Sequence, residues 1–371
     1  MVLLLGGDDE SGKASRSVFG SATWAGPSPG VTLVYDAPMD AIPRALHGPD
    51  DVSPEWIESV LGRRVQAFER AESASTWGAH VRLRVRLEGD AAALRLRVKI
   101  GSSTVFGRAE VDYYTQKFTG LAGAPLLRCH HAAVDATHYH ILLDDVADTH
   151  RNQFEVVPTE RYGRAVVGAA ARLHAHRWPQ PPPDAAALDR ALAPARAGLA
   201  PMLDAMEQGF THEERDRVGA LFAWHPDAMR ARLAEPAGFT WIHGDLNPGN
   251  VLAPIEGDGP VYLIDHQPFA ESSLETWLGV SDIAHAIAVW WPVDARRAWE
   301  RSLVAHWHAG LVAGGVEGYP LSRAWEDWRF SVLQGIYVPA AWCSEPGAIT
   351  KTRWVWEPQL HRVLAAAADP A

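Results

Sequence analysis

The stretch Trp241-Ile-His-Gly-Asp-Leu-Asn-Pro-Gly-Asn-Val-Leu252 decides how this chain of 371 residues is interpreted. It places an acid, Asp245, and an amide, Asn250, five residues apart in a polar loop between apolar segments. Another apolar segment, Val261-Tyr-Leu-Ile-Asp-His-Gln267, contains a second acid, Asp265. Phosphoryl transfer requires groups of these kinds, because a carboxylate orients the attacking hydroxyl and oxygen ligands hold the Mg²⁺ that bridges the phosphates.

These motifs resemble those of the aminoglycoside-phosphotransferase and choline-kinase branch of the protein-kinase-like fold, and within it the ecdysteroid-kinase-like small-molecule phosphotransferases. His-Gly-Asp-x-x-x-x-Asn at 243–250 matches their catalytic loop, and Ile264-Asp-His-Gln is similar to their Ile-Asp-Phe-Gln metal strand. The resemblance implies ATP and Mg²⁺ as cofactors and a small-molecule hydroxyl as the phosphate acceptor. It further implies Asp245 as the catalytic base, with Asn250 and Asp265 as metal ligands.

One position departs from the family pattern, because His266 stands where the family usually has Phe. We therefore expect different packing beneath the metal site. The alternative interpretation of the region is a surface turn, since Asp and Asn are common turn residues. The loop and the second acid occur together in the expected order, which favours the kinase interpretation.

Upstream, apolar and polar residues alternate in two runs, 81–88 and 93–100. This alternation predicts an antiparallel hairpin with one buried face. Lys99 ends the second run in a position that resembles the phosphate-gripping lysine of kinases, and Glu110, in a helix expected at about 107–120, resembles its partner. Such a pair would fix the ammonium toward the α- and β-phosphates. The alternatives are an exposed lysine and an ordinary helical glutamate.

Two other segments are similar to family features. A strand expected at 138–143 runs into Leu142-Leu-Asp-Asp-Val146, which looks like the segment joining the two lobes. The resemblance implies that backbone groups of this segment, including those of Leu143, contact the adenine. Downstream, Asp282 in Ser-Asp-Ile-Ala-His would brace the catalytic loop through backbone N–H groups; otherwise it is an acid favoured by the dipole of a helix N-terminus.

The turn that would cover the phosphates is expected within residues 71–79. Ser73, Ser75 and Thr76 offer hydroxyl and backbone N–H groups for this purpose. The stretch has one glycine, Gly78, where protein kinases use three, so an ordinary hairpin loop is the alternative.

Two other motifs have simpler explanations. Gly7-Asp-Asp-Glu-Ser-Gly-Lys13 mimics a P-loop, but Ala14 follows the lysine where Ser or Thr is required, and three acids would repel phosphate. His174-Ala-His176 looks like a metal-binding pair. It lies in an alanine-rich helical run, where residues two apart do not share a face.

The order of the elements predicts an α+β, two-lobed protein-kinase-like fold. We expect a loose leader at 1–50, an N-terminal nucleotide-binding lobe at 51–147, and a helical C-terminal lobe at 148–371 that holds the catalytic loop and the acceptor site. The first helix should begin at Pro54 with Ser53 as its cap.

Nine of the sixteen tryptophans lie after residue 285. Most should be core residues of a helical subdomain, although one or two could line the acceptor pocket. Glu326, Asp327 and Glu345 could receive a cationic acceptor or belong to a solvated surface.

Composition limits the class of partner. The formal net charge is −11, which argues against sequence-independent binding to nucleic acid or an anionic membrane. No apolar run reaches the ~18 residues of a membrane span. With two cysteines and no signal segment, the expected location is the cytoplasm. Oligomeric state is left open by the sequence.

Three other functions remain open at this stage. One is an aminoglycoside kinase that confers antibiotic resistance. Another is a nucleotide-binding pseudokinase regulator, although the intact set of polar residues argues against it. The third is a metal-dependent hydrolase that uses His243, Asp245 and Asp265.

Overall fold

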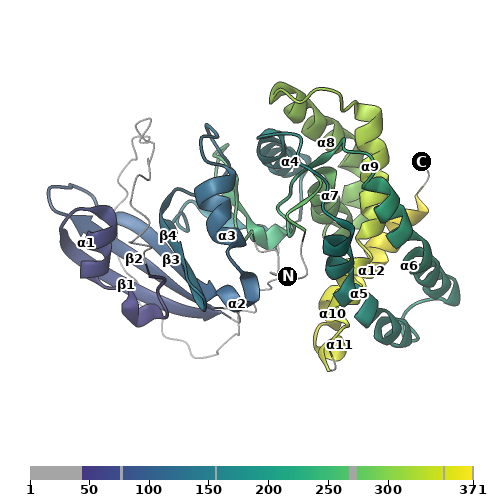
Figure 1. Ribbon diagram of the computed structural model, residues 1–371, viewed down its shortest axis with the longest axis horizontal. Helices are drawn as coiled ribbons and strands as arrows, with labels where there is room; N and C mark the ends of the chain where they lie inside the picture. The colour runs from purple at the N-terminus through teal and green to yellow at the C-terminus, as the bar shows by residue number, and fades with distance from the viewer. Residues whose placement is uncertain (1–43, 76–77, 155–156, 267–273, 346, 370–371) are drawn as a thin grey trace.

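The computed structural model describes residues 44–75, 78–154, 157–266, 274–345 and 347–369. A five-stranded antiparallel sheet occupies one side of the molecule, and helices make up most of the other (Figure 1). The strand order is β1-β2-β3-β5-β4, with bounds β1 (Val65–Ser75), β2 (Gly78–Leu87), β3 (Leu94–Ser102), β4 (Cys129–Val134) and β5 (His138–Asp144). The chain therefore has the predicted α+β, two-lobed kinase-like fold.

The predicted hairpin is present as strands β2 and β3, which pair antiparallel. Val81, Leu83 and Val85 are at most 2% exposed, while the arginines between them are exposed. Successive side chains on a strand point to opposite faces, so the sequence alternation gives the sheet one apolar face and one polar, basic face.

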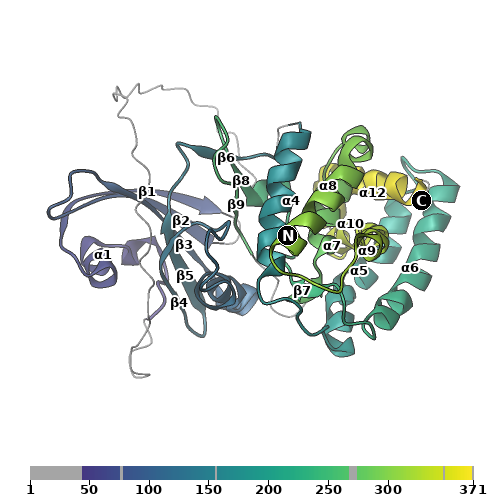
Figure 2. The same ribbon diagram turned by 90° about the horizontal axis from the view of Figure 1, so that it is seen from above.

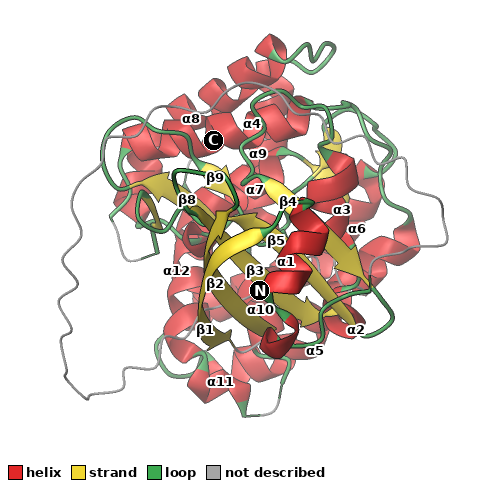
Figure 3. Cartoon of the chain, turned by 90° about the vertical axis from the view of Figure 1, so that its left-hand side faces the viewer, coloured by secondary structure: helices red, strands yellow, loops and turns green. Residues whose placement is uncertain are grey.

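Helix α1 (Pro54–Leu61) covers the apolar face of the sheet (Figure 3). It begins as predicted: the Ser53 side chain accepts a hydrogen bond from the Trp56 N–H, and Pro54 is the first helical residue. Residues 44–50, which we placed in the leader, also pack here, since Leu46 is 5% exposed and belongs to the same core. The rest of the predicted leader, 1–43, lies outside the described residues.

The helix expected at about 107–120 is present in a shorter form, because helical residues run without a break from Ala109 to Lys117. The structure has α2 (Ser103–Phe106), α3 (Ala109–Asp112) and a π-helical turn, η2 (Tyr113–Lys117). Gly107 separates α2 from α3 with a φ of +61°, a conformation that ends a right-handed helix.

Small sheets lie between the five-stranded sheet and the helices (Figure 2). One contains β6 (His150–Asn152), β8 (Val251–Pro254) and β9 (Tyr262–Leu263), and the other pairs β7 (Phe239–Trp241) with β10 (Thr276–Leu278). Strands β7 and β8 flank the 243–250 loop, and β9 directly precedes the segment that contains Asp265. The boundary proposed at 147/148 stays a prediction; it falls between β5 and β6.

The remaining helices form the second part of the molecule: α4 (Glu160–Ala175), α5 (Ala185–Ala205), α6 (His212–Arg232), α7 (Val280–Ala284), α8 (Val293–Ala313), α9 (Leu321–Gln334), α10 (Tyr337–Trp342), α11 (Ala348–Lys351) and α12 (Arg353–Ala368). Single turns are η1 (Pro49–Asp51), η3 (Pro248–Asn250) and the π-helical η4 (His285–Val289). Trp307, Trp328 and Trp356 are at most 2% exposed, so the expectation of a tryptophan-rich core is confirmed. None of the described helices is long and apolar enough to cross a membrane.

The contacts of His225 in α6 predict how the stability of this helical core depends on pH. Its Nε2–H donates to the Phe330 carbonyl (3.2 Å) and its Nδ1 faces the Tyr337 hydroxyl (3.0 Å). Burial lowers the pKa of His225 to about 4, so the unfolded chain binds the proton more readily. The stabilising contribution is present above pH 6.5 and is lost as the pH falls toward 4.

We expect this histidine alone to cost about 2 kcal/mol of unfolding free energy between pH 7 and pH 5. Urea denaturation of His225→Gln should show a correspondingly smaller pH dependence than wild type. His212→Gln, at an exposed position, is the control and should behave as wild type. An unchanged slope in His225→Gln would contradict the assignment.

Candidate active site

The 243–250 loop connects β7 to β8 and is held by its own side chains. Asn250 Nδ2 donates to the Asp245 carbonyl (2.8 Å) and lies 3.1 Å from Asp245 Oδ2. Asn247 accepts from the Gly249 N–H and donates to Asp245 Oδ1 (3.0 Å). Gly244 adopts a φ of +81°, which glycine tolerates without strain. The loop therefore presents the Asp245 carboxylate in a fixed orientation.

Asp282 of α7 holds the start of this loop, as the sequence predicted. Its Oδ2 accepts the His243 N–H (2.6 Å) and its Oδ1 accepts the Gly244 N–H (2.9 Å). His174 of α4 donates to the same carboxylate (3.0 Å) and accepts from the Trp307 indole (3.0 Å). Burial opposes ionisation, but the hydrogen bonds from His174 and from the His243 backbone lower the pKa of Asp282. The brace is thus an ionised, fully hydrogen-bonded carboxylate.

Lys99 meets two acids from distant parts of the chain. Its Nζ lies 2.9 Å from Glu110 Oε2 in α3 and 2.8 Å from Oδ1 of Asp265, which follows β9. The Tyr139 hydroxyl donates to Glu110 (2.9 Å). Both predicted partners are therefore brought together, and neither Lys99 nor Glu110 is an exposed bystander.

The opposite charges of Lys99 and its neighbouring carboxylates keep Lys99 and Asp265 ionised. Burial alone would lower the pKa of Lys99, but Asp265 and Glu110 outweigh it and raise that pKa well above its ordinary value. Burial raises the pKa of Asp265, and the Lys99 ammonium overcomes this effect and lowers it. At neutral pH the site holds one ammonium between carboxylates.

The donor set near Asp265 suits a hard divalent cation. Asn250 uses its amide nitrogen on Asp245, so its oxygen remains for a ligand. Lys99 contacts Oδ1 of Asp265, which leaves Oδ2 for a cation. Asp265 has a φ of +58°, an uncommon conformation that clusters at functional sites. Amide and carboxylate oxygens are the ligands that Mg²⁺ prefers, so the residues fit that ion.

The phosphate-covering turn is only partly described. Ser73 and Ser75 belong to strand β1, where they pair with His80 and Gly78 of β2. Ser73 is exposed, and Thr76 lies outside the described residues. Most of the expected turn is therefore strand, and the roles of these three residues in nucleotide binding stay predictions.

Leu143 lies near the end of strand β5, just before the segment that connects the two lobes. In β5 it pairs with Arg97 on one side and Cys129 on the other, and it is 7% exposed. Its side chain belongs to a core cluster with Phe106 and Tyr139. Contact between its backbone and a base stays a prediction.

His266, which takes the place of the family Phe, makes both ring and hydrogen-bond contacts. Its ring stacks on Tyr113 with centroids 4.3 Å apart. Nδ1–H donates to the His243 carbonyl (3.0 Å), and Nε2 faces the Lys117 ammonium (3.5 Å). Burial and Lys117 lower the pKa of His266 far below its ordinary value, so a neutral ring links η2 to the 243–250 loop.

The sequence interpretation missed two residues on the sheet face that carries Lys99. His80 pairs with Lys99 in register, and Arg97 lies two residues before Lys99 on the same face. Burial, together with the charges of Arg97 and Lys99, lowers the pKa of His80 to about 4. Strand alternation with Lys99 was the available signal, but it required the register between β2 and β3.

His285 is a third missed residue. It begins the π-helical turn η4, and its Nε2 lies 3.3 Å from Asp245 Oδ1. Burial would raise the pKa of Asp245, but the neighbouring His285 ring and the hydrogen bond from Asn247 lower it below the ordinary value. The residue belongs to the Ser-Asp-Ile-Ala-His segment, but spacing alone did not show that η4 turns it toward Asp245.

Two alternatives from the sequence lose their basis. Both ring nitrogens of His174 are used on Asp282 and Trp307, which removes the metal interpretation of His174-Ala-His176. Asp327 is neither solvated nor free for a cationic acceptor. It is 2% exposed and forms a bidentate pair with Arg232. Glu326 and Glu345 are exposed.

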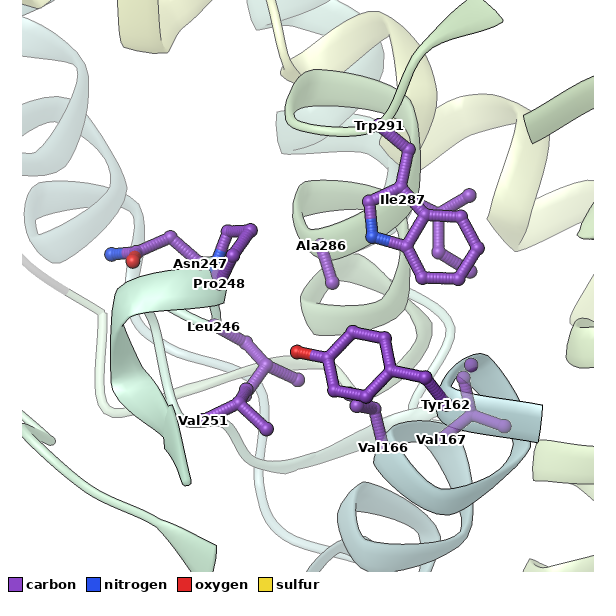
Figure 4. Close-up of a pocket in the computed structure, with 11 residues that line it drawn as sticks. Tyr162, Val166, Val167, Leu246, Asn247, Pro248, Val251, Ala286, Ile287 and Trp291 are labelled. Atoms are coloured by element: carbon purple, nitrogen blue, oxygen red, sulfur yellow. The ribbon is translucent and has the colours of Figure 1, made fainter. Parts of the chain in front are cut away.

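A small cavity lies behind the 243–250 loop (Figure 4). Tyr162 of α4 points across it toward Leu246 and Val251, and Trp291 closes another side. Its volume is about 10 Å³, far below the ~300 Å³ or more of ligand pockets. This cavity is a packing gap beneath the loop, so an acceptor must bind elsewhere.

Residues 135–325, more than half of the chain, match the phosphotransferase enzyme family. The chain belongs to this family and is a small-molecule kinase. The match includes the 243–250 loop, Asp265 and Asp282. It does not support the narrower ecdysteroid-kinase-like assignment, which is not confirmed. No curated protein gives a significant match.

Among solved structures, the chain is similar to a spectinomycin phosphotransferase bound to ADP and spectinomycin, with 11% identity, 85% of this chain and 96% of that chain covered, and a TM-score of 0.48. An ethanolamine kinase of Plasmodium vivax gives 11% identity, coverages of 86% and 84%, and a TM-score of 0.49. A macrolide 2'-phosphotransferase from Brachybacterium faecium gives 15% identity, coverages of 85% and 97%, and a TM-score of 0.38.

The Lys99 contacts predict the effect of Lys99→Met on stability. The substitution would leave buried Glu110 without the ammonium that lies 2.9 Å from it. We expect a loss of about 3 kcal/mol in unfolding free energy. In a double-mutant cycle with Glu110→Gln, the double mutant should lose about 1 to 3 kcal/mol less unfolding free energy than the sum of the two single losses.

The matched control is the exposed pair Arg63–Asp90, for which the same cycle should give less than about 1 kcal/mol. Urea denaturation of the four proteins in each cycle provides the measurement. Equal coupling energies for the two pairs would show that Lys99 and Glu110 form an ordinary surface contact.

Proposed function

We propose that this protein transfers the γ-phosphoryl group of ATP to a hydroxyl of a small molecule, in a reaction that requires Mg²⁺. The observation that carries the proposal is the convergence of Lys99 and Asp265, 166 positions apart in sequence and 2.8 Å apart in space, beside a loop that presents Asp245 and Asn250. In its crystal structure the spectinomycin phosphotransferase holds ADP, which supports a nucleotide as the donor.

Each residue then has a distinct task. Lys99, held by Glu110, positions the α- and β-phosphates. Asn250 and Asp265 hold Mg²⁺, which when bound neutralises charge on the transferring group. Asp245 orients the acceptor hydroxyl and receives its proton. A bond forms between the acceptor oxygen and the γ-phosphorus, the bond from that phosphorus to the bridging oxygen breaks, and ADP leaves with that electron pair.

The lowered pKa of Asp245 agrees with its task. An ionised carboxylate can accept a hydrogen bond from the hydroxyl over the whole neutral range. Positioning and electrostatics carry most of the catalysis in phosphoryl transfer, so a weak base in the right place is sufficient.

A metal-dependent hydrolase built on His243 is less consistent with the contacts. His243 Nε2–H donates to the Ile264 carbonyl (2.8 Å), and Nδ1 faces the Asp245 N–H (3.4 Å). Both nitrogens serve to hold the 243–250 loop, so this ring is poorly placed to bind a metal. Turnover that persists without ATP would revive the hydrolase.

Two substitutions separate the roles of the acids. Asp265→Asn should weaken Mg·ATP binding itself, because it removes charge from the metal site. Asp245→Asn should keep Mg·ATP affinity near wild type and lose roughly 10² to 10⁴ in transfer rate, or about 3 to 5 kcal/mol in activation free energy. Calorimetry measures the affinity, and ADP release with an acceptor identified by screening a mixed alcohol library measures the rate.

Asp258→Asn, at an exposed position, is the control and should match wild type in both assays. A wild-type transfer rate in Asp245→Asn would remove that residue from the reaction. Unchanged Mg·ATP affinity in Asp265→Asn would remove Asp265 from the metal site.

A further inference from the structure

One group of three metal-binding side chains contains no residue of the candidate active site. Among the residues that the structure describes, His47, Asp135 and His138 each offer one ligand atom, and these three atoms lie within 4.8 Å of one another. His47 belongs to the segment before α1, while Asp135 and His138 lie at the turn between β4 and β5. Side chains that are 88 positions apart in sequence therefore meet beside the five-stranded sheet.

The contacts between these side chains bring the ligand atoms together. His47 Nε2 lies 2.9 Å from Asp135 Oδ2. The His138 ring stacks on the His47 ring, with centroids 4.5 Å apart and an angle of 20° between the planes. Ligand atoms that share a tetrahedral Zn²⁺ are about 3.4 Å apart, because each bond to the ion is about 2.1 Å long. Atoms already within 4.8 Å of one another can reach this spacing by rotation of the side chains.

The turn between β4 and β5 fixes the Asp135 carboxylate. Its Oδ1 accepts the backbone N–H groups of Thr137 and His138 (2.9 Å each) and the Thr137 hydroxyl (3.2 Å). Its Oδ2 faces His47. The two backbone hydrogen bonds, followed by the hydrogen bond from His47, lower the pKa of Asp135. The carboxylate is therefore ionised at neutral pH and can bind a cation through Oδ2.

The Thr137 hydroxyl also determines which nitrogen of His138 can bind a metal. The hydroxyl hydrogen goes to Asp135 Oδ1, so the hydroxyl oxygen accepts from His138 Nδ1, which lies 2.9 Å away. Nδ1 then carries the proton of the neutral ring, and Nε2 keeps the lone pair that a metal needs. Metal-binding histidines commonly donate the other ring N–H to an oxygen in this way, which fixes the tautomer and the direction of the ring.

The backbone of His47 is anchored on both sides. The preceding residue, Leu46, is 5% exposed, and its N–H donates to His140 Nδ1 (3.0 Å). The N–H groups of His47 and Gly48 donate to Asp51 Oδ2 (2.7 and 3.1 Å). Because the backbone is already fixed, binding an ion here would have to order only side chains.

The donor set selects the kind of ion. Two imidazole nitrogens and one carboxylate oxygen suit Zn²⁺, whereas Mg²⁺ prefers oxygen ligands alone. The side chains of His47 and Asp135 are 39% and 29% exposed, so an ion can enter from solvent and keep water as a further ligand. It would replace the proton that His47 Nε2 shares with Asp135.

We propose that His47, Asp135 and His138 form a site for Zn²⁺, which ties the segment before α1 to the turn between β4 and β5. The site is independent of the proposed function, because none of these residues takes part in the phosphoryl transfer described above.

Calorimetry on the metal-free, full-length protein tests the site, with Zn²⁺ as the probe and excess Mg²⁺ present to occupy sites made of oxygen ligands. We expect a single Zn²⁺ to bind per chain with roughly micromolar affinity or tighter. His138→Gln and Asp135→Asn should each weaken binding about tenfold or more. Asp135→Asn keeps an oxygen for the backbone N–H groups of the turn, so it removes the ligand charge without removing the turn. His212→Gln, at an exposed position, is the control and should bind Zn²⁺ as wild type does.

The melting temperature gives a second measurement of the same site. Zn²⁺ should raise the Tm of wild type and of His212→Gln, because an ion that binds the folded chain stabilises it. The Tm of Asp135→Asn should stay nearly unchanged when Zn²⁺ is added. Three results would overturn the proposal: no Zn²⁺ binding by wild type, wild-type affinity in His138→Gln, or an equal rise of Tm in Asp135→Asn.

Discussion

The ion pair of Lys99 with Glu110 and Asp265 is the interaction on which the site depends. It joins strand β3, the short helix α3 and the segment after β9, which are otherwise separate parts of the chain. A lysine this buried is costly unless carboxylates neutralise it. The contact with Asp265 requires the five-stranded sheet and the segment after β9 to lie together, so the site is complete only in the folded chain.

A second buried charge fixes the other half of the site. Asp282 accepts from two backbone N–H groups and from His174, which Trp307 holds in turn. This chain of contacts runs from the tryptophan-rich core to the 243–250 loop. The ring nitrogens of one core histidine and one core tryptophan thus orient a carboxylate that is 2% exposed.

Local sequence predicted what local spacing determines. Asp245, Asn250 and Asp265 could be proposed as site residues because a loop and a strand end fix their spacing within a short stretch. Ser53 and Pro54 predict a helix start without any long-range information, and the structure confirms it. His80, Arg97 and His285 could not be identified, because their positions depend on strand register and on the π-helical turn η4. The helix expected at about 107–120 begins two residues later, at Ala109, because Gly107 has a φ of +61°, and it ends in the π-helical turn η2; periodicity reveals neither feature.

We propose that Lys99, Asn250 and Asp265 form a site for a metal-bound nucleotide. The most direct measurement is the affinity of the wild-type protein for ATP, determined by calorimetry with Mg²⁺ and again with Mg²⁺ removed by a chelator. Without the metal, the phosphates would face the Asp265 carboxylate unshielded. We therefore predict that Mg²⁺ strengthens ATP binding by about tenfold or more, that is by about 1.4 kcal/mol. An affinity that is the same with and without Mg²⁺ would contradict the proposed metal site.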